Sequence, residues 1–295
     1  MKVTLIGLGN MGTAIGGVLD RAPGISLTAW NRTAARRAGI SWSPRTAGTL
    51  TAAIEAGEIV IVCVRDCAAA LEILTGAGVA AALRGKPLIQ LSNGPVRDVN
   101  RLTEWAGQAG IPYLDGSIMG SVHDIGERHC AVAVCGPEDL WSRCTALIRT
   151  FAPRSFYAGT DPARGKAMNA AVAGLLAIDL AGFIQTAAVA DACGISPGEF
   201  FETCESMADA VREQWQRTAQ NWFTGNRETR LNGTASVAMW QQEVGHLLAN
   251  AVDKGVPAEF LTAAHEVFAN AAASGRGSED AAVLLESLRP GNPTA

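Results

Sequence analysis

The feature that most restricts the fold of this chain is a glycine-rich turn close to its start. The motif G-L-G-N-M-G follows directly on a strand-like run, Lys2 to Ile6, and opens a helical stretch. In a turn of this kind Gly7 permits the tight bend, Gly9 lets the backbone approach a pyrophosphate, and Gly12 lets helix and strand pack closely. The N-terminus of the helix then faces the anion. Because the motif opens an alternating strand and helix pattern, we interpret it as a dinucleotide site rather than a structural turn.

The rest of the first half alternates short β-branched runs with Ala-rich stretches, the pattern of a parallel sheet wrapped by helices. The runs are continuously apolar, as expected of strands that are covered on both faces. We expect strands over residues 2–6, 25–30, 59–64, 87–91, 112–114 and 131–134. Helices are expected over residues 11–20, 49–56, 99–109 and 137–151. The predicted fold class is α/β, with an N-terminal Rossmann domain built on a doubly wound parallel sheet.

The second half of the chain differs from the first in its residue pattern. A segment rich in Ala, Leu and Ile runs without proline from Lys166 to about Ala192, too long for an ordinary surface helix. A helix that is apolar on nearly every side must be buried on nearly every side, so we expect a second subunit to cover it. The chain thus divides into a dinucleotide-binding Rossmann domain over residues 1–160 and an all-α domain over residues 161–290, which we expect to carry the dimer contact. The long interdomain helix joins the two.

Composition and charge narrow the class of protein. At about 150 residues per domain, 295 residues make about two domains. Hydrophobic residues at 48% and charged residues at 18% indicate a compact soluble protein. The formal net charge of -4 excludes nucleic acid as an expected partner, and neither cysteines nor histidines show metal-ligand spacing. The longest apolar run, residues 170–180, is too short for the roughly 20 residues that a bilayer requires, so we expect a cytoplasmic protein and no membrane partner.

The end of the second predicted strand indicates which dinucleotide binds. An acidic residue there accepts hydrogen bonds from the ribose 2′-hydroxyl and favours NAD. The chain reads W-N-R-T at residues 30–33 instead, with Arg36 and Arg37 about one helical turn beyond. Guanidinium groups bind phosphate bidentately, so NADPH is favoured over the alternative of a solvated basic helix start. The residues expected at the cofactor are Gly7, Leu8, Gly9, Asn10, Met11, Gly12, Asn31, Arg32, Thr33, Arg37, Val64 and Asn93.

A polar pair stands at the start of the long helix. Lys166 and Asn169 are three residues apart and therefore lie on one face. Such residues can simply snorkel and cap a helix end, respectively. A polar pair at a domain junction is nevertheless where active sites usually collect. We therefore treat both residues as candidates for the reaction centre.

Motifs along nearly the whole chain resemble one known family. They are G-L-G-N-M-G (7–12), W-N-R-T (30–33), L-S-N-G-P (91–95), Y-L-D-G-S-I-M-G-S-V (113–122), G-T-D-P (159–162), A-G-F (181–183) and G-R-G-S-E-D (275–280). Together they are similar to the imine reductases and reductive aminases of the β-hydroxyacid dehydrogenase superfamily. The resemblance implies NADPH-dependent reduction of C=N bonds in a homodimer whose long helices cross. Each cleft would then combine the nucleotide domain of one subunit with the helical domain of the other.

Two departures from the wider superfamily favour the imine branch. In the hydroxyacid dehydrogenases, the segment that matches residues 117–122 is a Ser-Gly-Gly type loop that holds a substrate carboxylate. Here Ile118, Met119 and Val122 make this loop more apolar, so an acid substrate would lose its anchor. A second lysine of those dehydrogenases is missing, because the corresponding stretch reads M-W-Q-Q at residues 239–242.

Other positions depart from the imine reductases themselves. Asn169 stands where that family commonly has Asp or Tyr, either of which delivers a proton, whereas an amide does not. Ala177 stands where an aromatic residue is often found. Lys166 matches the catalytic lysine of the hydroxyacid dehydrogenases. The sequence therefore carries the reaction residue of one branch inside the overall pattern of the other.

These residues suggest a mechanism with one open point. Our hypothesis is that the substrate enters as an iminium or is protonated through water, and that Asn169 and Asn93 orient it by hydrogen bonds. Lys166 is either a desolvated proton donor or a side chain that points away and binds the cofactor or backbone carbonyls. Asp179, in the middle of the apolar helix, either fixes the dimer crossing through a pair or enters the cleft of the partner subunit.

The resemblance also implies where a substrate pocket lies. The expected pocket residues are Met119, Val122, His123, Trp215, Met239 and Trp240. For the aromatic residues the alternative is ordinary core packing. The leading hypothesis is an NADPH-dependent reductase of cyclic or preformed imines. The alternatives are an NADP-dependent 3-hydroxyacid dehydrogenase that uses Lys166, and a non-catalytic NADP(H)-binding regulatory protein.

Overall fold

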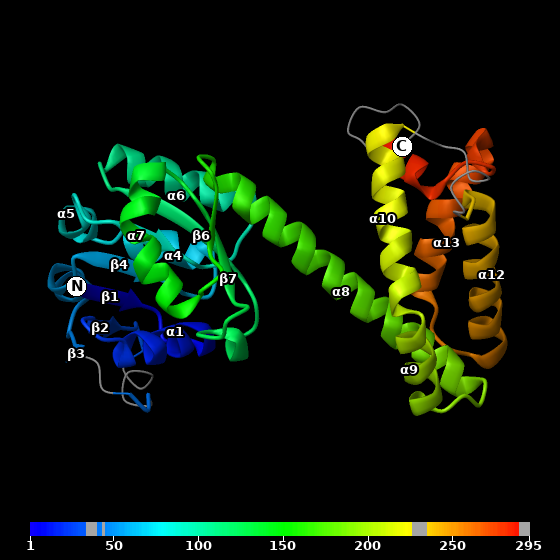
Figure 1. The fold of residues 1–295 in the computed structure, drawn as a ribbon, viewed down its shortest axis with the longest axis horizontal. Coiled ribbons are helices and arrows are strands. Elements are labelled where there is room, and N and C mark those ends of the chain that lie inside the picture. Colours follow the sequence, from blue (N-terminus) through cyan, green and yellow to red (C-terminus); the bar gives the residue numbers. More distant parts are fainter. Residues whose placement is uncertain (34–39, 43–44, 226–234, 289–295) are drawn as a thin grey trace. The chain divides into compact units, whose positions relative to one another are not determined.

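A computed structural model describes residues 1–33, 40–42, 45–225 and 235–288 of the chain (Figure 1). The chain forms two compact units, residues Met1–Gly174 and Leu175–Ala295. The division falls inside the long helix α8, Pro162–Ala192, so the first turns of this helix belong to the first unit.

The first unit is built on a sheet of eight strands in the order β3-β2-β1-β4-β5-β6-β7-β8. Their bounds are β1 Lys2–Ile6, β2 Ser26–Trp30, β3 Arg45–Thr46, β4 Ile59–Val62, β5 Leu88–Gln90, β6 Tyr113–Met119, β7 Ala131–Cys135 and β8 Phe156–Gly159. Strand β1 lies between β2 and β4, with Leu5 opposite Ala29 and Ile61. The predicted doubly wound α/β architecture is confirmed.

One pair of strands departs from the predicted parallel sheet. Strands β6 and β7 are antiparallel, whereas the other neighbouring pairs among the described strands are parallel. The connection between them, residues 120–130, holds only a short 3₁₀ turn, Val122–Asp124. A parallel pair needs a crossover of about a dozen residues or more, usually a helix, and this connection is too short and irregular to supply one.

Helices cover both faces of the sheet. In the first unit they are α1 Asn10–Arg21, α3 Leu50–Ala56, α4 Cys67–Leu74, α5 Val79–Leu83, α6 Val96–Gln108 and α7 Glu138–Phe151. Helices α1 and α7 pack with Val3 and Leu5 on one face of β1, whereas α3, α4 and α6 pack with Ile6 on the other. Successive strand residues point to opposite faces, which is why the continuously apolar strands are buried on both sides.

The structure contains elements that the sequence did not predict. Helices α4 and α5 and strands β3 and β8 are absent from the predicted set. Strand β3 has only two residues, both exposed, and β8 is half-exposed, so neither carries the apolar run on which the prediction relied. Helix α4 begins with a cap in which the Asp66 side chain accepts from Ala69 N at 2.7 Å. This Asp cap was a usable signal for a helix start.

Among its described residues the second unit has helices joined by turns and no strand, with one isolated bridge between Ser236 and Asp280, which agrees with the predicted all-α domain. Its helices are the second part of α8, then α9 Pro197–Ser206, α10 Ala208–Thr224, α12 Val237–Lys254, α13 Glu259–Ala271 and α14 Leu284–Ser287, with short turns at Ala272–Arg276 and Ala281–Val283. Gln185 on α8 donates to Pro257 O at 2.7 Å and accepts from Leu261 N at 3.0 Å. This side chain ties α8 to the start of α13.

Helix α8 carries apolar side chains that the described residues leave exposed. Leu176 is 64% exposed and Ile184 is 59% exposed, and Ile178 and Leu180 are similarly open. Among the described residues α8 is the one helix long and apolar enough to cross a membrane, by length and composition only. The sequence expectation that no stretch would qualify is wrong by this measure, because it considered the apolar run at residues 170–180 alone, whereas the helix extends over 31 residues.

Candidate active site

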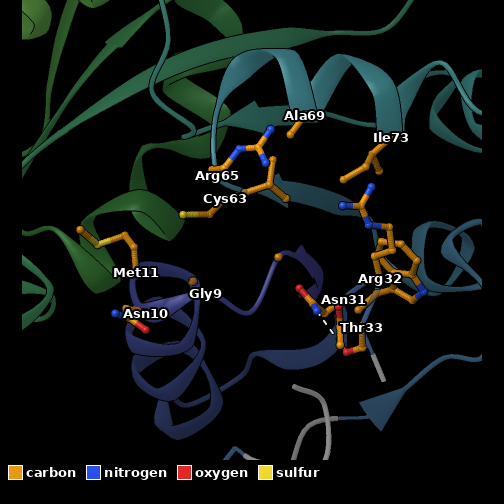
Figure 2. Close-up of a pocket in the computed structure, with 14 residues that line it drawn as sticks. Gly9, Asn10, Met11, Asn31, Arg32, Thr33, Cys63, Arg65, Ala69 and Ile73 are labelled. Atoms are coloured by element: carbon orange, nitrogen blue, oxygen red, sulfur yellow. Dashed lines mark hydrogen bonds between the residues drawn. The ribbon is translucent and has the colours of Figure 1, made fainter. Parts of the chain in front are cut away.

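A cleft of about 440 Å³ opens at the carboxyl ends of β1, β2 and β4 (Figure 2). The chain leaves β1 for β2 on one side and β4 lies on the other, so this is the point at which the strand order reverses. Open α/β sheets bind their ligands at such a point. The cleft is lined by Gly7, Gly9, Asn10, Met11, Gly12, Trp30, Asn31, Arg32, Thr33, Cys63, Val64, Arg65, Ala69 and Ile73.

The three glycines of the turn have different roles. Gly7 has a φ of 104°, and a Cβ there would overlap the carbonyl oxygen of Cys63. A Cβ at Gly12 would overlap the carbonyl oxygen of Gly7, so both positions require glycine for the fold itself. A Cβ at Gly9 would meet nothing within 4 Å. Gly9 therefore keeps open space in front of the turn, as the approach of a ligand requires.

The first turn of α1 faces this open space. Gly9 is its N-cap, and no side chain caps the helix there. The first N–H groups of a helix have no partner within the helix, and they bind anions together with the helix dipole. The turn is therefore suited to the pyrophosphate of a dinucleotide.

A hydrogen bond of Asn31 holds the end of β2 against the glycine turn. Asn31 Oδ1 accepts from Leu8 N at 3.0 Å, and Asn31 Nδ2 donates to Thr33 O at 3.1 Å. The Leu8 side chain is buried in the core, so Leu8 contributes its backbone and not its side chain. Arg32 is largely exposed and lies 3.3 Å from Glu72 on α4. The predicted cofactor residue Arg37, and Arg36 beside it, lie outside the described residues.

Arg65 is a cleft residue that the sequence reasoning missed. It lies three residues after the end of β4, and its Nε lies 2.7 Å from Asp66 Oδ2. Figure 2 shows Arg65 beside Ala69 and Arg32 beside Ile73, so the two guanidinium groups approach α4 at different points along the helix. The available signal was a basic residue at the carboxyl end of a strand next to the glycine turn.

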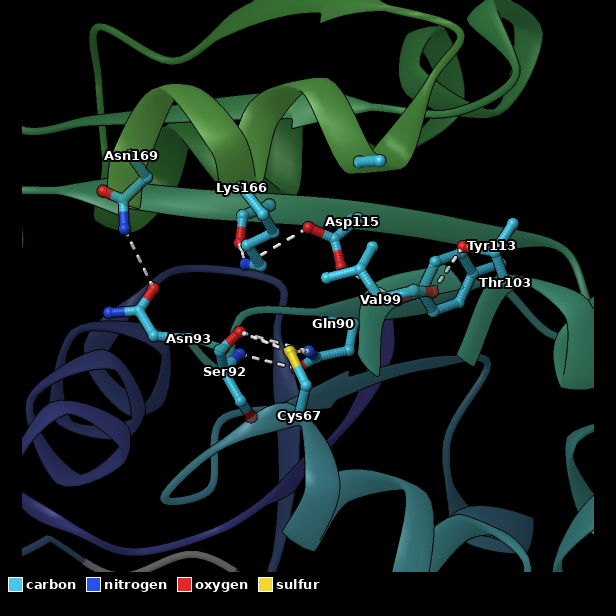
Figure 3. Close-up of polar contacts among 12 residues, drawn as sticks. Cys67, Gln90, Ser92, Asn93, Val99, Thr103, Tyr113, Asp115, Lys166 and Asn169 are labelled. Atoms are coloured by element: carbon cyan, nitrogen blue, oxygen red, sulfur yellow. Dashed lines mark hydrogen bonds and ion pairs between the residues drawn. The ribbon is translucent and has the colours of Figure 1, made fainter. Parts of the chain in front are cut away.

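A second group of polar residues lies where α8 begins (Figure 3). Lys166 and Asp115 are each only 1% exposed, and Lys166 Nζ lies 3.1 Å from Asp115 Oδ1. The ammonium also donates to Gly116 O at 2.6 Å. The other carboxylate oxygen accepts from the Tyr113 hydroxyl at 2.8 Å. Burial raises the pKa of Asp115 to about 6, and Lys166 opposes this rise. Lys166 therefore lies in the interior of the first unit and is not part of the cleft lining.

Two of the predicted reaction-centre residues are brought together. Asn169 Nδ2 donates to Asn93 Oδ1 at 3.2 Å, and both side chains are accessible. Asn93 follows β5, and its backbone carbonyl accepts from Cys67 N at 2.8 Å. Figure 3 shows Asn169 and Lys166 projecting from the same side of α8, as their spacing predicts.

The predicted substrate-pocket residues fall into two places. Met119 ends β6, while Val122 and His123 lie in the 3₁₀ turn after it. In the second unit an apolar pocket of about 570 Å³ brings Trp215 and Trp240 together, but its lining does not include Met239. The pocket is lined by Met207, Ala210, Val211, Gln214, Trp215, Thr218, Trp240, Phe268 and Ala281. Within the part of the chain that the structure describes, no group of His, Cys, Asp and Glu side chains is placed to hold a metal ion.

Two family profiles divide the chain between them. Residues 2–159 match the NAD binding domain of 6-phosphogluconate dehydrogenase. Residues 161–290 match the C-terminal domain of the NADPH-dependent reductive aminase-like proteins. The chain belongs to the imine reductase and reductive aminase family. The family identified from the sequence motifs is thereby confirmed.

Known members of this family share the fold along their whole length. The imine reductase from Myxococcus stipitatus in complex with NADP⁺ is 26% identical, with a TM-score of 0.93, over 98% of this chain and 100% of that one. The reductive aminase from Aspergillus terreus in complex with NADPH and ethyl-5-oxohexanoate is 26% identical, with a TM-score of 0.88, over 98% of this chain and 99% of that one.

A sequence relative of a different kind is longer than this chain. The cytokine-like nuclear factor N-PAC from Anopheles gambiae is 25% identical over 98% of this chain. The chain spans 50% of the length of that relative.

Proposed function

We propose that this chain is an NADPH-dependent oxidoreductase that reduces the C=N bond of cyclic or preformed imines and iminium ions to amines. The observation that carries the proposal is the presence, in one chain, of the glycine-turn cleft and of a reductive aminase-like C-terminal domain. The imine reductase and reductive aminase structures that resemble it were solved with NADP⁺ and NADPH.

The cleft residues fit NADPH. The open side of Gly9 and the uncapped first turn of α1 suit the pyrophosphate. Arg32 and Thr33, at the end of β2, are placed for a 2′-phosphate, and no carboxylate stands at the tip of that strand. Arg65 adds a second guanidinium to the lining. NADPH, when bound, supplies the hydride for the reduction.

The paired amides orient the substrate nitrogen. Asn93 Oδ1 is used by Asn169 Nδ2, whereas Asn169 Oδ1 accepts no hydrogen bond from the described residues. This oxygen accepts the N–H of an iminium and holds the C=N carbon in one orientation. Because an amide carries no transferable proton, the proton enters with the substrate or through water. Lys166 is too deeply buried, and too fully used by Asp115 and Gly116, to be that donor.

The exposed apolar surface of α8 is covered by a second copy of the chain in a cytoplasmic homodimer. Several leucine and isoleucine side chains of α8 are more than half exposed, and a helix that faces only solvent does not carry so large an apolar surface. The carboxylate of Asp179 in the middle of α8 disfavours a bilayer, where a central Asp costs about 2.5–3.5 kcal/mol by insertion scales. Sedimentation in detergent-free buffer tests this assignment: a species of two chains supports it, and a stable single chain or a need for detergent contradicts it.

One pair of assays tests the activity. NADPH absorbance is followed with a panel of cyclic imines, and NADP⁺ reduction is followed separately with 3-hydroxy acids. Consumption of NADPH with an imine supports the proposal. Turnover only with hydroxy acids would identify the hydroxyacid dehydrogenase alternative, and tight NADPH binding without turnover on either panel would identify a non-catalytic NADP(H)-binding protein.

A further inference from the structure

We propose that Asp115 is a positioning residue that acts through Lys166 to set the first turns of α8, and so places Asn169 against Asn93. The inference rests on the proposed function, because the positioning matters through the orientation of a substrate at Asn169. Asp115 does not line the cleft, and although it belongs to the motif at residues 113–122, the sequence predicts no role for it.

A contribution to folding stability does not by itself explain the buried Asp115–Lys166 pair. Both side chains are almost wholly removed from water. Taking two charges out of water costs free energy that their attraction only partly recovers, so a well-packed apolar pair of similar volume is often as stable or more stable. A buried pair is better explained where it fixes a geometry that apolar side chains would leave loose. The geometry fixed here is the placement of α8 on β6.

The contacts of Lys166 join the start of α8 to the middle of β6. Its Nζ reaches both Asp115 Oδ1 at 3.1 Å and Gly116 O at 2.6 Å, so two successive residues of β6 hold one side chain of α8. The strand is enclosed at this point, since a Cβ at Gly116 would come within 2.6 Å of Leu91 and 2.8 Å of Val132. It therefore offers a fixed reference for the helix.

The same stretch of α8 lies close against the sheet. A Cβ at Gly165 would come within 3.0 Å of Cys135 Sγ, so the helix backbone is close to β7 at the residue before Lys166. Close packing sets how near α8 approaches the sheet at this residue. The hydrogen bond of Lys166 to Gly116 O and its ion pair with Asp115 hold this turn of α8 at one register on β6.

Asn169 lies about 4.5 Å further along the helix axis, at a rise of 1.5 Å per residue. Its partner Asn93 is held from the other side, through its carbonyl oxygen and Cys67 N at 2.8 Å. The neighbouring Ser92 N donates to Gln90 Oε1 at 2.6 Å, which fixes the same loop. The loop and the helix are thus held independently, and the single hydrogen bond between the two amides depends on the register that Lys166 sets.

Asp115 also balances a charge close to the cleft. Burial raises the pKa of the Cys63 thiol to about 12, and the charge of Lys166 opposes that rise, so the ammonium acts on a residue of the cleft lining. An uncompensated ammonium there would repel an iminium substrate. The carboxylate of Asp115 removes this repulsion while leaving the hydrogen-bonding geometry of Lys166 intact.

The test uses the double variant Asp115→Asn/Lys166→Met, because either single change leaves a buried charge without its partner and can prevent folding. Helix content and NADPH affinity, measured by circular dichroism and fluorescence, are expected to stay close to those of the unaltered protein. We expect kcat on an imine to fall by about 10²-fold, the loss that a misplacement of about 1 Å produces. The conservative control Tyr113→Phe removes only the bond to Asp115 Oδ2 and should retain most of kcat.

Non-additivity identifies the route of the effect. If Asp115 and Lys166 act through Asn169, adding Asn169→Ala to the double variant should lower kcat no further than Asn169→Ala alone. Losses that multiply, or a double variant with unchanged kcat, would overturn the proposal. Hydrogen exchange over residues 163–174 gives a readout that does not depend on activity. Faster exchange there in the double variant supports the positioning role even if no imine is reduced by the unaltered protein, whereas equal exchange rejects it.

Discussion

Asn169 and Asn93 are joined by a side-chain hydrogen bond of 3.2 Å although they are 76 residues apart in the sequence. One amide stands on the first turns of α8 and the other on the loop after β5. The pair presents hydrogen-bonding groups but no group that delivers a proton at ordinary pH. This arrangement suits an enzyme that orients an iminium rather than one that generates it.

Replacing the amide by an acid tests which residue faces the reacting nitrogen. We predict that Asn169→Asp introduces a new ionisation into the pH profile of kcat, because a positioned carboxyl group can act as an acid, an effect worth about 10²–10⁴-fold in rate. Asn169→Ala is the control, with a lowered kcat and no new ionisation. A pH profile of Asn169→Asp that matches that of the unaltered protein would show that Asn169 does not face the substrate.

The choice of coenzyme should depend on Arg32. We predict that Arg32→Ala weakens NADPH binding by about 10-fold or more and leaves NADH binding nearly unchanged, since a hydrogen bond between charged groups contributes about 1.5–3 kcal/mol. The matched variant Glu72→Gln removes the present partner of Arg32 and should not weaken NADPH binding. Titrations followed by fluorescence measure both. Equal losses for NADPH and NADH in Arg32→Ala would show that Arg32 does not contact a 2′-phosphate.

Alanine substitutions at two glycines of the same turn should have different effects, one on NADPH binding and the other on folding. Gly9→Ala is predicted to fold normally and to weaken NADPH binding by roughly 10-fold or more, because the added methyl group enters open space in front of the turn. Gly7→Ala should instead fail to fold, since its φ is 104° and its Cβ would overlap a carbonyl oxygen. Circular dichroism and NADPH titration separate the two results. If Gly9→Ala binds NADPH as tightly as the unaltered protein, the pyrophosphate does not bind at this turn.

The buried carboxyl group predicts a dependence of stability on pH. Burial raises the pKa of Asp115 from 3.8 to about 6, so between these values the folded chain binds this proton more tightly than the unfolded chain does. The contribution of Asp115 to stability is therefore greatest below pH 3.8 and is lost as the pH rises through about 6. Relative to Asp115→Asn/Lys166→Met, the free energy of unfolding should fall by about 1–3 kcal/mol over this range. Urea denaturation at several pH values measures it, and a difference that rises with pH would be the opposite of this account.

Local patterns were enough to predict the glycine turn and the strands beside it. The turn, β1 and the start of α1 depend on residues that are close in sequence, and Gly7, Gly9 and Gly12 stand where their motif requires. The W-N-R-T segment likewise follows a buried strand, so Arg32 was predictable as a cleft residue. Continuous apolar runs also made most central strands visible, because both faces of those strands are buried.

Long-range relationships were not predictable in the same way. The environment of Lys166 depends on Asp115 and Gly116, the latter 50 residues away, and periodicity along α8 carries no information about either. The sequence therefore left a proton donor and a structural role equally open. The antiparallel pairing of β6 and β7 was missed because apolar runs do not encode strand direction. Arg65 was not predicted because the apolar run extends to Val64, whereas β4 ends at Val62 and leaves Arg65 in the loop that lines the cleft.

The most direct test of the central claim is to follow the hydride itself. NADPH that carries deuterium at the transferable position of its nicotinamide is mixed with the protein and a cyclic imine, and the product is examined by NMR. The account predicts an amine with one deuterium on the carbon that was double-bonded to nitrogen. No labelled amine from any imine in the panel, with the coenzyme bound and unconsumed, would contradict it.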